Sequence, residues 1–162
     1  MAFQTKINQQ PAPGLPGDFA SANPRASVLA GPGALVSGAN GLTPGLFGWS
    51  DADGKVSNTG TGAPTGFVHR EMGIASITNF LDQAGNLIMP GREVTLFNEG
   101  DFWARATTVT SIGQKVFAVL ATGAVATGEA GATIAGAVET NFRVGSVALV
   151  GEVFKITTWG KQ

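Results

Sequence analysis

The side chains that could do acid–base or metal chemistry are few in this sequence of 162 residues. Two of its eleven carboxylates, Asp51 and Asp53, lie in Asp-Ala-Asp-Gly-Lys. A calcium-binding loop beginning at Asp51 needs glycine at its sixth position and glutamate at its twelfth, where this chain has Val56 and Gly62. The motif therefore predicts a β-turn, and we interpret Asn-Glu-Gly-Asp at residues 98–101 in the same way.

The single histidine, His69, has no second histidine or cysteine with which to build a metal site. No nucleophile can be assigned as its catalytic partner. We expect a hydrogen-bonded structural role for it, with a pH-sensitive interface as the alternative. The glycine-rich stretches 31–38 and 60–64 lack the spacing of phosphate-binding loops and predict turns. The sequence thus predicts no catalytic residue, no metal site, no cofactor and no enzymatic activity.

The charge pattern argues against binding to nucleic acid or membrane. The net charge is −1, only 13% of residues are charged, and lysine and arginine occur singly rather than in runs. A nucleic-acid-binding protein needs clustered cations to displace phosphate counterions. The longest uncharged stretch, residues 26–50, is interrupted by glycine and proline and cannot form a membrane helix. Low charge with 43% hydrophobic residues instead suits a surface covered by other proteins.

The first part of the chain differs from the rest. Residues 1–24 hold four of the eight prolines, and proline favours extended backbone. Phe3, Ile7 and Phe19 are spaced along this segment as apolar anchors. We therefore expect residues 1–24 to form an extended N-terminal arm and residues 25–162 to form one β-rich domain, although composition alone fits a flexible terminus equally well.

The remainder reads as short apolar runs separated by turn residues, which predicts strands at residues 27–30, 34–37, 45–50, 66–70, 86–89, 93–97, 102–110, 115–121, 133–138, 141–149 and 153–159. At most one short helix is expected, at residues 74–83, where apolar residues recur at helical spacing. The predicted fold class is all-β, and a small barrel, a jelly roll and a sandwich all remain open.

Several segments together resemble the capsid cement proteins of tailed bacteriophages. The likeness is most specific in Gly-Asp-Phe-Ala-Ser-Ala-Asn-Pro-Arg at residues 17–25. It extends to residues 2–4, 9–14, 27–31, 47–49, 66–70 and 151–160, and so spans nearly the whole chain. The resemblance implies a non-enzymatic protein of the capsid exterior, assembled in the cytoplasm of the bacterial host. It implies binding to the major capsid protein of an expanded head, where the protein clamps neighbouring capsomers.

The same resemblance implies association of copies of the chain as a dimer or trimer, with the trimer favoured. Tryptophan is a frequent interface anchor, so one of Trp49, Trp103 and Trp159 is expected to bind a partner while the others lie in the core. The residues that we expect to contact capsid or a sister subunit are Phe3, Gln4, Ile7, Phe19, Arg25 and Trp49. Alternative functions are another virion part, such as a tail, baseplate or receptor-binding module, or a small hydrolase with two distant carboxylates.

Overall fold

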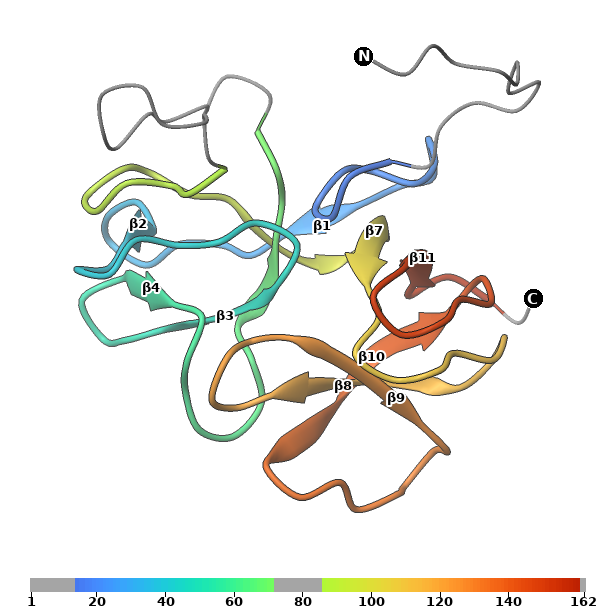
Figure 1. Cartoon of the computed structure of the whole chain (residues 1–162). Coiled ribbons are helices and arrows are strands. Elements are labelled where there is room, and N and C mark those ends of the chain that lie inside the picture. Colours follow the sequence, from blue (N-terminus) through green and yellow to red (C-terminus); the bar gives the residue numbers. More distant parts are fainter. Residues whose placement is uncertain (1–13, 72–85, 161–162) are drawn as a thin grey trace, which may run out of the picture.

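The computed structural model describes residues 14–71 and 86–160, and these residues form strands and turns without a helix (Figure 1). The all-β prediction is therefore confirmed for this part of the chain. The helix expected at residues 74–83 lies outside the described residues. The strands form two sheets, one built mainly from the first half of the chain and the other from the second half.

The first sheet has six strands in the order β1-β6-β5-β3-β4-β2, and all neighbours are antiparallel except β2 and β4. Its strands are β1 (Ala26–Ser27), β2 (Val36–Ser37), β3 (Phe47–Ser50), β4 (Lys55–Ser57), β5 (Gly66–Val68) and β6 (Leu96–Glu99). The segment before β6 runs beside β2, where Val94 N–H donates to the Leu35 carbonyl and Ser37 N–H to the Arg92 carbonyl. This pairing covers the outer edge of β2.

The second sheet has five antiparallel strands in the order β7-β11-β10-β8-β9. Its strands are β7 (Asp101–Arg105), β8 (Lys115–Val119), β9 (Val125–Gly128), β10 (Ala137–Val144) and β11 (Val153–Thr157). After β7 the chain crosses to β9, where Ala106 forms a parallel bridge with Val125 and Thr127 N–H donates to the Thr108 hydroxyl. The sheet is therefore almost closed on itself.

Three details of the strand prediction were wrong. The strand expected at 86–89 is only an isolated bridge between Ile88 and Leu42. The separate strands expected at 133–138 and 141–149 are one strand, β10, because the polar stretch from Glu139 to Asn141 continues the pairing across an irregularity between Glu139 and Arg143. Strands β4 and β9 were missed, since each is short and has few large apolar residues. Both strands are held in place by pairing with neighbouring strands, and this pairing outweighs their own weak strand propensities.

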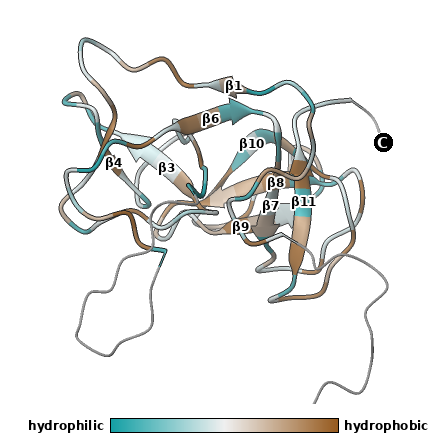
Figure 2. Cartoon of the chain, turned by 90° about the horizontal axis from the view of Figure 1, so that it is seen from above, coloured by the Kyte–Doolittle hydropathy of each residue, from teal (hydrophilic) through white to brown (hydrophobic). Residues whose placement is uncertain are grey.

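A cluster of phenylalanines packs between the two sheets. Figure 2 shows hydrophobic segments, in brown, on strands of both sheets, such as β6 and β11. The Phe102 side chain on β7 is fully buried and lies at its centre, with ring centroids 5.2 Å from Phe67, 5.5 Å from Phe97 and 6.1 Å from Phe142. The tilted and edge-on arrangements are those that aromatic pairs prefer. A second cluster is aliphatic and packs against the six-stranded sheet. It contains Leu35, Leu42, Val56, Val68, Ile88, Val94 and Leu96.

Residues 17–20 lie along the outer edge of β7. Gly17 N–H donates to the Trp103 carbonyl, Trp103 N–H to the Asp18 carbonyl and Ala20 N–H to the Asp101 carbonyl, at 2.8–2.9 Å. Gly17 is buried with φ of 95°, and a Cβ there would lie 2.9 Å from the Arg70 Cβ, so the close approach requires glycine. This part of the N-terminal segment is thus built into the domain.

His69, which directly follows β5, also holds residues 17–20 in place. Its Nδ1 lies 2.8 Å from the Gly17 carbonyl oxygen, so Nδ1 carries the proton and donates. Its ring stacks on Phe19 with centroids 3.9 Å apart. Burial lowers the pKa of His69 below its ordinary value of 6.5, although the hydrogen bond to Gly17 and the charges of Glu71 and Asp18 oppose this. The neutral, hydrogen-bonded ring fits the structural role expected from the sequence.

We predict that Phe102→Ala destabilises the protein by about 3–5 kcal/mol, because it leaves a cavity where rings from both sheets meet. Urea denaturation followed by tryptophan fluorescence measures the free energy of unfolding. Val147→Ala is the control, since this exposed side chain should change stability by no more than about 0.5 kcal/mol. Equal effects of the two substitutions would contradict the central role of Phe102.

We predict that stability falls as the pH drops from about 7.5 to about 5, because the folded protein binds its histidine proton more weakly than the unfolded chain does. The contribution is present above pH 6.5 and is lost as the pH falls toward the lowered pKa. His69→Asn keeps a side-chain N–H donor but does not titrate. Since His69 is the sole histidine, this variant should show a flatter dependence of the free energy of unfolding on pH. If the free energy of unfolding depends on pH in the same way in both proteins, His69 is not the group responsible.

Candidate interaction surface

The structure places the sequence-predicted contact residues in different environments. Phe3, Gln4 and Ile7 lie outside the described residues. Phe19 packs its ring against the core, 5.4 Å from Phe102. Trp49 is buried, and its Nε1–H donates to the Gly62 carbonyl at 3.1 Å. Neither aromatic ring is presented outward, so any contact that either makes with a partner stays a prediction.

Arg25 is exposed, and its guanidinium lies over the Phe19 ring at 3.9 Å from the centroid. Within the described residues this arginine contacts an aromatic face, an arrangement that leaves the guanidinium edge available for hydrogen bonds. The structure thus brings Phe19 and Arg25 together at the start of β1, while Trp49 lies apart from them on β3.

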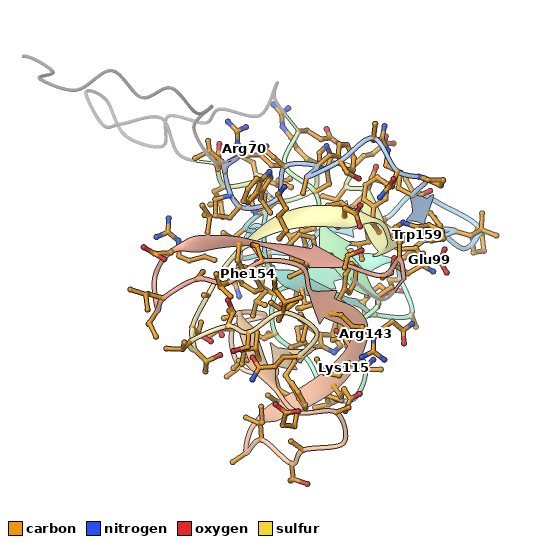
Figure 3. The ribbon with its side chains drawn as sticks, turned by 90° about the vertical axis from the view of Figure 1, so that its right-hand side faces the viewer. Arg70, Glu99, Lys115, Arg143, Phe154 and Trp159 are labelled. Carbon is orange, nitrogen blue, oxygen red and sulfur yellow. The ribbon has the colours of Figure 1, made fainter. Side chains whose placement is uncertain are left out.

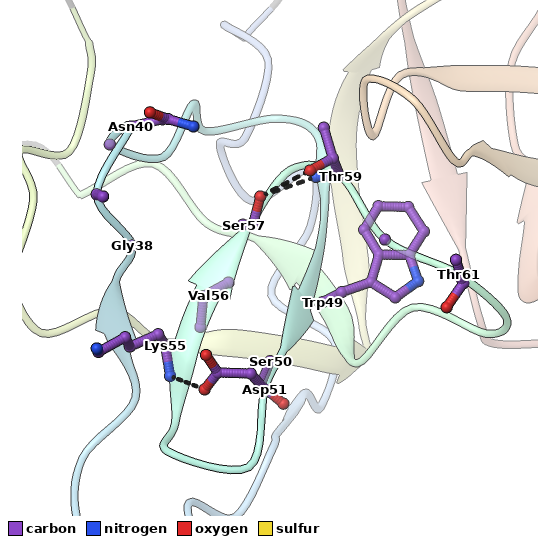
Figure 4. A pocket seen from close by; sticks show the side chains of 13 residues that line it. Gly38, Asn40, Trp49, Ser50, Asp51, Lys55, Val56, Ser57, Thr59 and Thr61 are labelled. Atoms are coloured by element: carbon purple, nitrogen blue, oxygen red, sulfur yellow. Dashed lines mark hydrogen bonds between the residues drawn. The ribbon is translucent and has the colours of Figure 1, made fainter.

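A cleft of about 430 Å³ opens beside β3 and β4, and its lining includes Asp51 and Lys55 of the Asp-Ala-Asp-Gly-Lys motif (Figure 4). Asp51 accepts hydrogen bonds from the backbone N–H groups of Asp53 and Lys55 at 2.9 and 2.8 Å, which confirms the predicted turn. The Ser57 hydroxyl lies 3.0 Å from that of Thr59. These polar groups satisfy one another, and no cluster of three metal-ligating side chains occurs within residues 14–71 and 86–160.

The most distinctive surface feature is a group of exposed aliphatic side chains, which we call the aliphatic patch. Its members lie in the β7–β8 and β10–β11 connections, are 55–68% exposed, and are Val109, Ile112, Val147, Leu149 and Val150. Scattered exposed aliphatic residues are ordinary, but a group of them on adjoining segments marks a surface that other molecules cover. Sequence reasoning missed this patch because it assigned residues 141–149 to a strand with a buried face.

Backbone hydrogen bonds hold the two connections of the aliphatic patch together. Thr110 N–H donates to the Ala148 carbonyl at 3.0 Å, and Gly151 N–H donates to the Ala106 carbonyl at 2.8 Å. The buried Thr110 hydroxyl donates to the Ser146 carbonyl at 3.1 Å. Because the loops are paired in this way, little further ordering entropy is lost when a partner binds them.

Exposed cations stand next to the aliphatic patch on the outer face of the five-stranded sheet. Arg105 on β7 donates through Nη1 to the Gly151 carbonyl at 3.0 Å. Lys155 on β11 lies with its ammonium 5.2 Å from the Trp103 ring. Arg143 on β10 is exposed beside Lys115, which forms an ion pair with Glu139 at 3.5 Å (Figure 3). The patch therefore combines an apolar centre with a positively charged border, a composition suited to an acidic protein partner.

The N-terminal segment reaches the same face of the molecule. Gly14 packs directly against the indole of Trp103, where any Cβ would overlap the ring. The chain before Gly14 thus starts from the outer face of β7.

No helix among the described residues is long and apolar enough to cross a membrane.

Comparison with known proteins gave no match among curated proteins. The fold is similar to that of a chain in a solved structure described as the capsid of Myoviridae phage XM1, with a TM-score of 0.59 and 20% sequence identity over 98% of both chains. The family model for the XM1 gp53 minor capsid protein matches residues 3–158. The predicted relationship to phage capsid-associated proteins is confirmed, and this chain belongs to the XM1 gp53 minor capsid protein family.

Proposed function

We propose that this protein binds the outer surface of the expanded phage head and clamps neighbouring capsomers. The observation that carries the proposal is the minor capsid family match, which extends over residues 3–158 and assigns a structural role in the virion. Clamping requires contacts with more than one neighbour, because several weak contacts held together give a tight and durable attachment. The partners are the major capsid protein and further copies of this chain, in a dimer or trimer.

The anchored N-terminal segment supports a clamp. Residues 17–20 are joined to β7 by backbone hydrogen bonds, and Asp18 pairs with Arg70 at 3.0 Å. The arm that we propose to grip a neighbouring capsomer is therefore residues 1–13, with Phe3, Gln4 and Ile7 as its contacts. A load on this arm passes through the β7 edge into the domain. Deletion of the arm up to residue 13 leaves residues 17–20, which are paired with β7, in place.

We predict that deletion of residues 2–13 weakens binding to expanded heads by at least about tenfold, while the midpoint of thermal unfolding stays unchanged. Cosedimentation of the purified protein with expanded heads and with unexpanded procapsids measures the binding. Phe3→Ser combined with Ile7→Ser keeps the length of the arm and tests its two apolar anchors. The intact chain should bind expanded heads alone and raise their resistance to heat.

The outcomes separate the arm from the clamp. A truncated chain that decorates heads as fully as the intact chain refutes the role of the arm but leaves head binding in place. An intact chain that binds neither shell refutes the clamp. Localisation of the protein to tails by immunogold electron microscopy would then favour a tail, baseplate or receptor-binding component.

A further inference from the structure

A second surface of the molecule is chemically complementary to the aliphatic patch. It is a cleft of about 360 Å³ on the six-stranded sheet, between the segment that follows β1 and the segment that precedes β6. Its apolar lining includes Val28, Leu35 and Val94. Its acidic lining consists of Glu71 and Glu93, both exposed, and we call it the acidic cleft.

The charges of the two surfaces are opposite. The aliphatic patch is bordered by Arg105 and Lys155, whose contacts within the chain are with a carbonyl group and an aromatic ring. The two ion pairs of the described residues involve neither these cations nor Glu71 and Glu93. The one carboxylate within the patch loops, Glu152, accepts a hydrogen bond from Leu149 N–H and so is used to close its own turn. Cations and carboxylates on both surfaces are therefore available to a partner.

We propose that copies of this chain associate head to tail, with the aliphatic patch of one copy seated in the acidic cleft of the next. The leucine and valine side chains of the patch then lie on the apolar lining of the cleft, and Arg105 and Lys155 face Glu71 and Glu93. The contact covers exposed apolar side chains, which is the main driving force for such an association. The opposite charges orient the two copies and disfavour patch-to-patch pairing, since that brings cations together.

The two surfaces belong to different sheets, which determines the kind of assembly. A contact between two different surfaces is heterologous. An open assembly therefore has a free patch on one end copy and a free cleft on the other until a ring closes. A two-fold dimer does not satisfy both surfaces through this contact. The inference concerns contacts between copies in solution and does not depend on which part of the virion they bind, so its test uses purified protein without capsids.

Charge reversal on each surface tests the contact. One variant carries Glu71→Lys and Glu93→Lys, and the other carries Arg105→Glu and Lys155→Glu. Each variant alone should associate at least about tenfold more weakly than the natural chain in sedimentation velocity. In an equimolar mixture the two variants should associate with each other, because the patch of each then meets an oppositely charged cleft on the other. Only an even number of copies can alternate in this way, so the recovered species are mixed assemblies of even number and not a closed trimer. Raising the salt concentration should weaken the association of the natural chain.

Two controls keep the test specific. Lys55→Glu reverses an exposed charge outside both surfaces and should leave association unchanged. Leu149→Ser removes an apolar side chain from the patch without changing charge and should weaken association, and circular dichroism establishes that each variant is folded. The proposal is overturned if the natural chain is monomeric or stops at a dimer, or if the cleft variant associates normally. It is also overturned if the mixture fails to recover association.

Discussion

Contact between phenylalanine rings from two small sheets is the interaction on which the rest of this structure depends. Phe67 and Phe97 come from the six-stranded sheet, Phe102 and Phe142 come from the five-stranded sheet, and their rings meet with centroids 5.2–6.1 Å apart. Strands of two to eight residues bury too little surface to be stable alone. The chain passes between the sheets at Gly100, whose φ of 136° lets β7 begin directly after β6.

This use of aromatic residues explains where the exposed apolar surface lies. Most of the large rings in the described residues lie in the core, with Trp159 as an exposed exception, so most of the exposed apolar area there comes from aliphatic side chains in the loops. The loops that carry Val109 and Leu149 are paired through their backbones and stand on the rim of a closed sheet. A rigid apolar surface with few charges suits a protein that spends its functional life packed among other subunits of a virion.

The fold class was predictable because glycine turns and short β-branched runs are local signals, and they marked most strands within a few residues. The extent of β10 and the existence of β4 and β9 were not, since these depend on partners far away in sequence. The same limit applies to the contact residues. Composition offers Trp49 and Phe19 as surface anchors, but long-range packing places Trp49 beneath Gly60 and Phe19 against His69. The aliphatic patch arises only when two distant loops pair.

The segment of residues 17–20 belongs both to the core and to the edge of the five-stranded sheet. Phe19 packs its ring on the aromatic cluster while the flanking backbone extends β7 by antiparallel hydrogen bonds. Antiparallel pairing resists a pull along the strand with all of its hydrogen bonds at once, whereas a pull across the strand breaks them one at a time. The proposed arm of residues 1–13 would therefore carry most load when the neighbour that it grips lies along the β7 axis, beyond Trp103. Gly14 rests on that indole, on the outer face of the sheet. That is also the face on which the cations stand.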